Sequence, residues 1–72
     1  MIKLIMEEQG EEHEYVLYEG NDIAAAMDLI RHIIIIHYRR EDENNHSVYF
    51  EIQDKYGFSI LDLKYNKSGF IN

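Results

Sequence analysis

The absence of cysteine is the feature that most limits what this 72-residue chain can fold into. A domain of this size gains only about 3–5 kcal/mol from its core, and small domains often add disulfides or a metal to compensate. Without cysteine, disulfides and thiolate metal sites are both excluded. We therefore expect a single domain over residues 1–72 with one thin core, and burial against a partner as the remaining source of stability.

Alternating apolar and polar residues predict two strands at the start of the chain. The alternation covers residues 2–6, and a second β-rich run follows at residues 15–18, after the polar stretch EEQGEEH. Gly20 closes this hairpin, and the side chain of Asn21 or Asp22 is expected to cap the helix that comes next.

A helical pattern of apolar residues begins at about Ile23. At about 100° per residue, one face of this helix is apolar. The residues on that face are Ile23, Ala26, Met27, Ile30, Ile33, Ile34, His37 and Tyr38. Ile35 falls on the polar side. A strand over residues 33–38 is the alternative, because isoleucine favours β-structure, but no turn signal separates these residues from the helical pattern before them.

The polar stretch EDENN breaks the helical pattern and predicts a loop. Residues 48–53 alternate and read as a third strand. A tight turn over residues 54–57 leads to a fourth strand at residues 58–65, which is apolar on both parities. The tail, residues 66–72, is expected to fray, with docking back of Phe70 and Ile71 as the alternative.

The expected fold is therefore α+β, with the order β-β-α-β-β. The first and fourth strands carry apolar residues on both faces and are expected at the centre, giving a mixed sheet of order 2-1-4-3 with one helix packed on it. This order and size resemble the β-grasp of ubiquitin-like and immunoglobulin-binding domains. The resemblance rests on element order across the whole chain, without a shared motif, so it implies no functional residue.

The acidity of the chain is regional. The net charge is −7, and all of it lies in residues 1–28, which hold eight acids and Lys3, whereas six acids balance six bases from residue 29 onward. Such a region repels phosphate backbones and anionic membranes and attracts basic protein surfaces. Neither nucleic acid nor a membrane is therefore expected as a direct partner. The alternative is that the tyrosine and basic side chains of the second half stack on the nucleobases of RNA. A plainer alternative is that the acids only keep a small domain soluble.

No enzyme, metal site or cofactor is expected. His32 and His37 would lie about 140° apart on the helix, whereas a shared metal needs the spacing i, i+4. A nucleophile would have to be Ser47, Ser59 or Ser68, and none of these falls in a strained turn. The glutamates of EEQGEEHE lie in a wet hairpin tip, where no carboxyl group is desolvated enough for acid–base catalysis.

A cytoplasmic location is expected from the apolar runs. MIKLIM is too short for a secretory signal, and the run of isoleucines at residues 33–36 is far below the roughly 20 residues that cross a bilayer.

The face of the sheet away from the helix is the first candidate binding surface. We expect it to carry Lys3, Ile5, Tyr15, Leu17, Tyr49, Phe58 and Ile60. That face is too apolar for water alone, and tyrosine is enriched at interfaces. The expected protein-binding residues are Glu7, Glu8, Glu11, Glu12, Glu14, Ile5, Tyr15, Leu17 and Tyr49. In this scheme the glutamates attract a basic surface and the apolar and aromatic side chains hold it.

The second candidate surface is on the helix. Leu29 and Ile36 extend its apolar arc beyond what one sheet needs, and they are assigned to the contact of a homodimer at micromolar concentration.

These observations lead to one expected function and one alternative. The first is a small acidic protein-binding module, an adaptor or inhibitor that covers a basic or apolar surface of a larger protein. A phage-type inhibitor that mimics the charge of nucleic acid belongs to this class. The alternative is a self-assembling structural domain whose apolar surfaces serve a homo-oligomer only.

Overall fold

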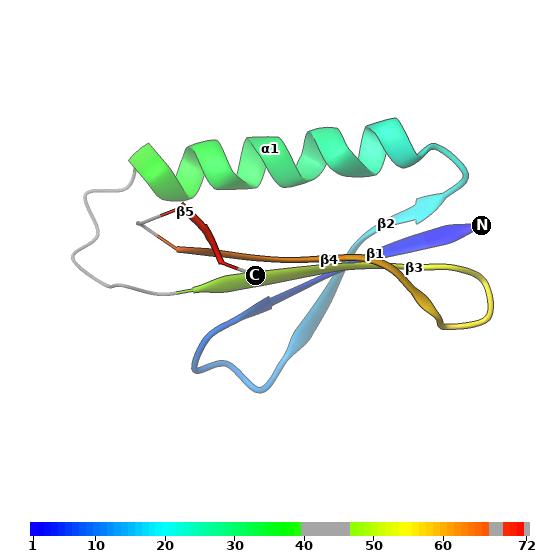
Figure 1. The fold of residues 1–72 in the computed structure, drawn as a ribbon, viewed down its shortest axis with the longest axis horizontal. Helices are drawn as coiled ribbons and strands as arrows, with labels where there is room; N and C mark the ends of the chain where they lie inside the picture. Colours follow the sequence, from blue (N-terminus) through cyan, green and yellow to red (C-terminus); the bar gives the residue numbers. More distant parts are fainter. Residues whose placement is uncertain (40–46, 67–68, 72) are drawn as a thin grey trace.

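The computed structural model describes residues 1–39, 47–66 and 69–71, with side-chain environments for residues 1–36 and 47–66. Its elements are β1 (Ile2–Glu8), β2 (Glu14–Gly20), α1 (Ile23–Arg39), β3 (Val48–Gln53), β4 (Ser59–Asn66) and β5 (Gly69–Ile71). The helix lies across one face of the sheet and the other face is left open (Figure 1). The α+β class and the first four strands are confirmed, and residues 33–38 are helical rather than extended.

The sheet is antiparallel throughout, and its strand order is β2-β1-β3-β4-β5. The predicted mixed order 2-1-4-3 is wrong, because β3 rather than β4 pairs with β1, from Lys3 opposite Gln53 to Glu8 opposite Val48. In an antiparallel sheet with one open face, a central strand alternates between buried and open positions. β3 shows this alternation over its whole length, whereas the second apolar parity of β4 comes from Ile60, which is half exposed at a β-bulge. The likeness to a β-grasp is therefore limited to the order of the first four strands and the helix along the chain, and does not include the order of the strands in the sheet.

The tail contains a fifth strand that the sequence pattern did not predict. Tyr65 pairs with Phe70, and Lys64 pairs with Ile71. The expected fraying therefore does not hold for Gly69–Ile71. The alternative, in which the tail docks back, is what the structure has. The central residue of β5, Phe70, pairs with the buried Tyr65.

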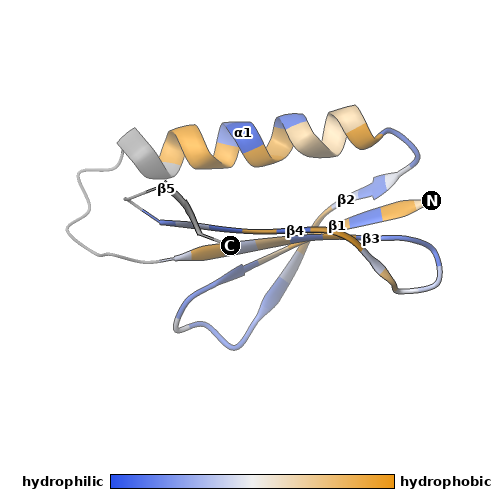
Figure 2. Cartoon of the chain, in the orientation of Figure 1, coloured by the Kyte–Doolittle hydropathy of each residue, from blue (hydrophilic) through white to orange (hydrophobic). Residues whose placement is uncertain are grey.

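The core lies between α1 and the covered face of the sheet. Its buried members are Leu4, Ala26, Ile30, Val48, Phe50, Ile52 and Tyr65. They come from the helix and from alternate positions of three strands, so the helical and strand periodicities point to the same layer. The lower part of the β1–β2 hairpin is hydrophilic and extends away from this layer (Figure 2).

The helix buries a narrower arc than the sequence predicted. The helix residues that pack on the core are Ala26, Leu29, Ile30, Ile33 and Ile34. Ile23 and Met27, which were assigned to the buried face, are exposed. A single helix contacts a sheet only along a stripe, so residues on the flank of that stripe stay in solvent. Ile35 is exposed as predicted, and the predicted burial of His37 and Tyr38 lies outside the described side chains.

The start of the helix is held by Asp22 of the β2–α1 connection and by Tyr18 of β2. The amides of Ala24 and Ala25 donate to Oδ1 of Asp22 at 3.0 and 3.2 Å, which confirms Asp22 as the cap. The amide of Asp22 donates to the hydroxyl of Tyr18 at 3.1 Å. The Tyr18 ring crosses so close to Gly20 that a Cβ there would lie 2.5 Å from its hydroxyl oxygen. Gly20 is therefore required for the Tyr18 side chain to reach the helix start.

Candidate functional site

The open face of the sheet carries three rows of side chains that run across the strands. By register, the first row is Glu14, Glu7, Tyr49 and Lys64. The second row is Val16, Ile5, Glu51 and Asp62, and the third is Glu19, Lys3, Gln53 and Ser59. Residues directly opposite in neighbouring strands lie on the same face. The open face therefore combines five acidic side chains and two lysines with Ile5, Val16 and Tyr49, and we call it the acidic face.

The acidic face is less apolar than the sequence predicted, because a β-bulge reverses the parity of β2. Leu4 pairs with Tyr18 and Ile5 with Val16, which leaves Leu17 as the extra residue. Leu17 packs against the core cluster from the covered face. Tyr15 pairs with Met6, which also packs on the core. The placement of Tyr15 and Leu17 on the open face was therefore wrong, and Val16 takes their place there.

Two residues at the centre of the acidic face are partly sheltered from water. Ile5 is only 8% exposed, although it lies on the open face and does not belong to the core cluster beneath the helix. Its partners across the strands are Val16 and Glu51. Tyr49 is half-buried, and its pKa is raised above the usual 10.0, first by burial and then by the negative charges of Glu51, Asp62 and Glu7. The electrostatic environment at the centre of this face is therefore negative.

A depression of about 260 Å³ opens where the β1–β2 turn meets the start of β3. Its lining residues are Glu7, Glu8, Gln9, Gly10, Glu11, Ser47, Tyr49 and Lys64. Two hydrogen bonds hold its wall: the Gln9 amide donates to the Ser47 carbonyl at 2.9 Å, and the Ser47 amide donates to Gln9 Oε1 at 3.3 Å. The depression brings three of the predicted acids, Glu7, Glu8 and Glu11, next to Tyr49.

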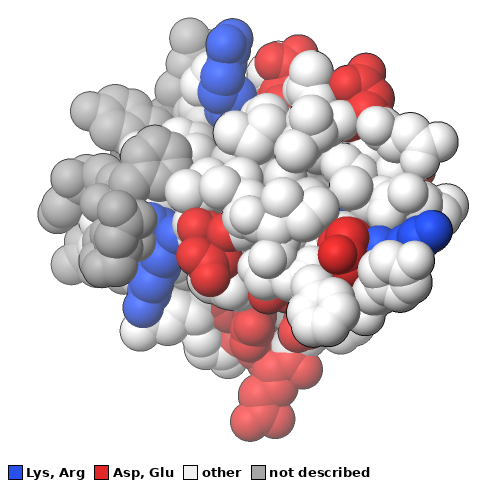
Figure 3. Space-filling model, turned by 45° about the vertical axis from the view of Figure 1, so that its right-hand side comes forward, with Lys and Arg blue, Asp and Glu red and all other residues white. Residues whose placement is uncertain are grey.

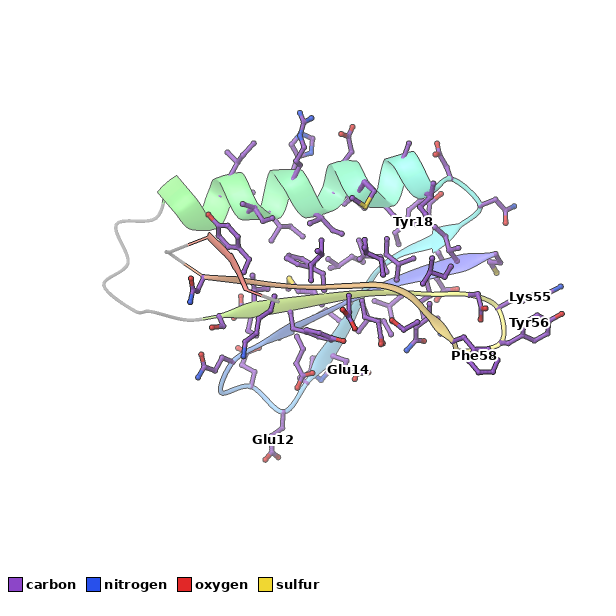
Figure 4. The ribbon with its side chains drawn as sticks, in the orientation of Figure 1. Glu12, Glu14, Tyr18, Lys55, Tyr56 and Phe58 are labelled. Atoms are coloured by element: carbon purple, nitrogen blue, oxygen red, sulfur yellow. The ribbon has the colours of Figure 1, made fainter. Side chains whose placement is uncertain are left out.

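Of the two remaining predicted acids, Glu12 lies at the hairpin tip and Glu14 lies in the first row of the acidic face, opposite Glu7. Glu12 points away from the body at the hairpin tip, and Glu14 lies beside the sheet (Figure 4). Tyr15 belongs to the hairpin tip as well, because its hydroxyl donates to Glu11 Oε2 at 3.1 Å and its ring meets the His13 ring edge-on at 4.5 Å. The hydrogen bond to Glu11 raises the pKa of Tyr15, with smaller contributions from the charge of Glu11, burial and Glu8.

The two helix residues assigned to a homodimer have different environments. Leu29 is half-buried and packs against the core, so it is not a surplus surface residue. Ile36 is 58% exposed and remains available for contact.

The most exposed aromatic side chains lie in the β3–β4 turn, which sequence reasoning did not assign to a site of its own. Tyr56 is 73% exposed and Phe58 is 71% exposed. Asp54 holds this turn, because its Oδ1 accepts from the amides of Tyr56 and Phe58 at 2.9 and 3.0 Å. The Lys55 Nζ lies 5.0 Å from the centre of the Tyr56 ring. These side chains project from the end of the sheet (Figure 4). An aspartate that opens a turn containing aromatic residues was the available sequence signal.

Acidic side chains gather at the lower end of the molecule, where the β1–β2 hairpin lies. Further acidic side chains lie at the top and among the uncharged side chains in the middle of the same view (Figure 3). Within the described part of the chain, no three His, Asp or Glu side chains are placed to hold a metal ion. No helix among residues 1–39, 47–66 and 69–71 has the length and apolar character needed to cross a membrane.

Comparisons with known protein families, with curated proteins and with solved structures found no match for this chain. The function must therefore be argued from the surface itself.

Proposed function

We propose that the chain is a small acidic protein-binding module, an adaptor or inhibitor whose acidic face covers a basic surface of a larger protein. The observation that supports this proposal is the set of acids that surrounds Ile5 and Tyr49 on an open sheet. These acids are Glu7, Glu14, Glu19, Glu51 and Asp62. Carboxylates fixed on a rigid sheet attract a basic partner, and an aromatic centre supplies contact area.

The sheet spaces these carboxylates regularly. Neighbouring strands lie about 4.8 Å apart, and side chains on one face repeat every second residue, about 6.8 Å along a strand. Lysine and arginine side chains of a partner can each meet a different carboxylate on such a grid. An inhibitor that mimics the charge of nucleic acid is one form of this function, because basic sites for phosphate also accept carboxylates.

The hairpin tip has a separate role in this proposal. Glu11 and Glu12 are exposed and, together with the half-buried Glu8 at the end of β1, extend the negative field beyond the sheet. Charges that stay in solvent act mainly on the rate of association. They are screened at physiological salt over about 8 Å. Residues that become buried in the complex, such as Tyr49, set the rate of dissociation instead.

Two triple variants that remove the same charge test this division. The face variant changes Glu7 and Glu51 to Gln and Asp62 to Asn, and the tip variant changes Glu8, Glu11 and Glu12 to Gln. A partner captured from the host and identified by mass spectrometry is immobilised, and both rates are measured by surface plasmon resonance at several salt concentrations. The face variant should associate more slowly and dissociate faster, whereas the tip variant should only associate more slowly.

Tyr49→Ala should dissociate at least about tenfold faster, because an aromatic residue at an interface centre contributes about 1–2 kcal/mol or more. Asp28→Asn, an exposed change on the helix, is the control and should leave both rates unchanged. If the face variant binds with parent rates in low salt, the acidic face only keeps the domain soluble and the proposal is wrong.

A further inference from the structure

Among the residues that the structure describes, one half of β4 has no strand partner on the side away from β3. β5 pairs with Lys64, Tyr65 and Asn66 only. Residues 59–63 pair with β3 on one side, and no described strand pairs with them on the other. An unpaired strand exposes backbone N–H and C=O groups that can pair with another chain. We call residues 59–63 the free edge of β4.

The free edge of β4 has little of the protection that sheet edges normally carry. Edges are usually blunted by charged residues, proline or a bulge. The other edge strand, β2, has Glu14, Glu19 and the bulge at Leu17. In the free edge of β4 the single charged residue is Asp62. Its bulge, at Ile60, lies near the start of the strand and leaves residues 61–63 in regular register.

Exposed apolar side chains lie along the free edge. Phe58 immediately precedes it, and Ile60 within it is 50% exposed. The helix contributes a third group. β2 and β3 are parallel and are joined by α1 across β1, and such crossovers are right-handed. With that hand, the flank of a right-handed helix that carries Ile23 and Met27 faces the β4 side of the sheet, and the flank of Ile36 faces the β2 side.

We propose that the chain forms a symmetric homodimer in which the free edges of β4 from two copies pair as antiparallel strands. With Leu61 opposite the partner's Leu61, Asp62 lies opposite the partner's Ile60. No like charges are then brought into opposition. A two-fold axis through this point also places the Ile23–Met27 flanks of the two helices on the same side of the joined sheet, where they approach each other.

Charge and area both favour a second copy as the occupant. Approach through the acidic face or the hairpin would bring like charges together, whereas residues 58–61 are uncharged. Phe58, Ile60, Ile23 and Met27 together expose on the order of 400 Å² per copy, so the pair buries about 800–1,200 Å² once the strand backbone is included. That area is at the low end for specific complexes and fits a reversible dimer. The acidic face takes no part in it, so the inference does not rest on the proposed function.

The test compares two exposed isoleucines that differ in their side of the molecule. Ile60→Lys puts a charge into the free edge, and Ile36→Lys puts the same charge on the opposite helix flank. Sedimentation equilibrium of the parent should show a monomer of 8.6 kDa in exchange with a dimer at micromolar concentration. Ile60→Lys should raise the dissociation constant at least tenfold, Ile36→Lys should leave it unchanged, and salt should have little effect on the parent.

Amide hydrogen exchange of the parent chain provides a second measurement that needs no variant to fold. The amides of residues 59–63 that point away from β3 should become protected as concentration rises, and those of β2 should not. A monomer at every concentration overturns the proposal. A dimer that dissociates when Ile36 is changed to Lys also overturns it. So does a dimer in which the amides of the free edge of β4 still exchange fast.

Discussion

Tyr49 lies in the middle of the acidic face, and its hydroxyl group reports on the charges around it. Burial disfavours the tyrosinate form most, and the negative charges of three acids, Glu51, Asp62 and Glu7, disfavour it further. The folded chain therefore holds the Tyr49 proton more tightly than the unfolded chain does, and its pKa is raised. Stability at alkaline pH is linked to this difference.

Tyr49→Phe should reduce the loss of stability at high pH. The unfolded chain releases the tyrosine proton near pH 10, before the folded chain does, so above that pH the folded state binds more protons. The contribution of Tyr49 to the free energy of unfolding is then constant below about pH 10. It falls as the pH rises from there toward the pKa of Tyr49 in the folded chain. Urea denaturation of parent and Tyr49→Phe at pH 8 and pH 11 measures the effect. Equal losses in the two proteins would show that Tyr49 does not contribute.

Single residues also show what the sequence could and could not predict about the site. Asp22 as the helix cap follows from local chemistry, because Asp, Asn and Ser accept the free amides of a first turn. The faces of Tyr15 and Leu17 do not follow, because EYVLYEG fits either face and a bulge of one residue exchanges them. Of the acids on the acidic face, Glu7 and Glu14 were found from charge alone. Glu19, Glu51 and Asp62 were missed because only the register of the strands places them on this face.

The helix shows the same limit at the scale of an element. Its existence, start and direction follow from periodicity and capping, but the centre of its buried stripe depends on the sheet beneath. Ile30 is buried and Ile35, although it has the same side chain, is exposed. The cost of removing either side chain should therefore differ, since a buried deletion leaves a cavity and an exposed one does not.

Ile30→Ala should lower the free energy of unfolding by about 2–4 kcal/mol, whereas Ile35→Ala should change it by less than about 1 kcal/mol. Urea denaturation followed by circular dichroism measures both values. The stripe assigned to α1 would be wrong if the two variants unfolded at the same midpoint.

The order of the strands was the part of the fold that the pattern could not supply. Both hairpins were predicted, because their strands are close in sequence and their turns have clear signals. Which strand of the second hairpin meets β1 depends on contacts between distant segments. Apolar residues on both parities of β4 favoured the wrong answer, because Ile60 is not buried by a second layer but exposed at a bulge.

At the scale of the whole molecule, the β2 edge and the free edge of β4 differ in charge. Each carries a bulge, but the β2 edge is acidic, whereas the free edge of β4 has Asp62 as its single charged residue. A dimer formed through β4 would leave both acidic faces on the same side of one continuous sheet. The proposed partner binding and the proposed dimer are therefore compatible, and each can fail without the other.

The pairing of β1 with β3 has a consequence for how the chain reaches its native state. It joins two halves that are separate in sequence: Gln9 and Ser47, which bond at its end, lie 38 positions apart. Hairpins close in about 1–10 μs, but contacts between distant segments require a large loss of chain entropy first and slow the reaction. The rate-limiting step of folding should therefore be the meeting of β1 and β3.

In stopped-flow measurements, Ile52→Val in β3 should mainly slow folding, whereas Leu29→Ala on the edge of the helix stripe should mainly speed unfolding. Until that meeting, the two hairpins remain separate in the chain, and the edge of β3 that later pairs with β1 is open to pairing with other molecules.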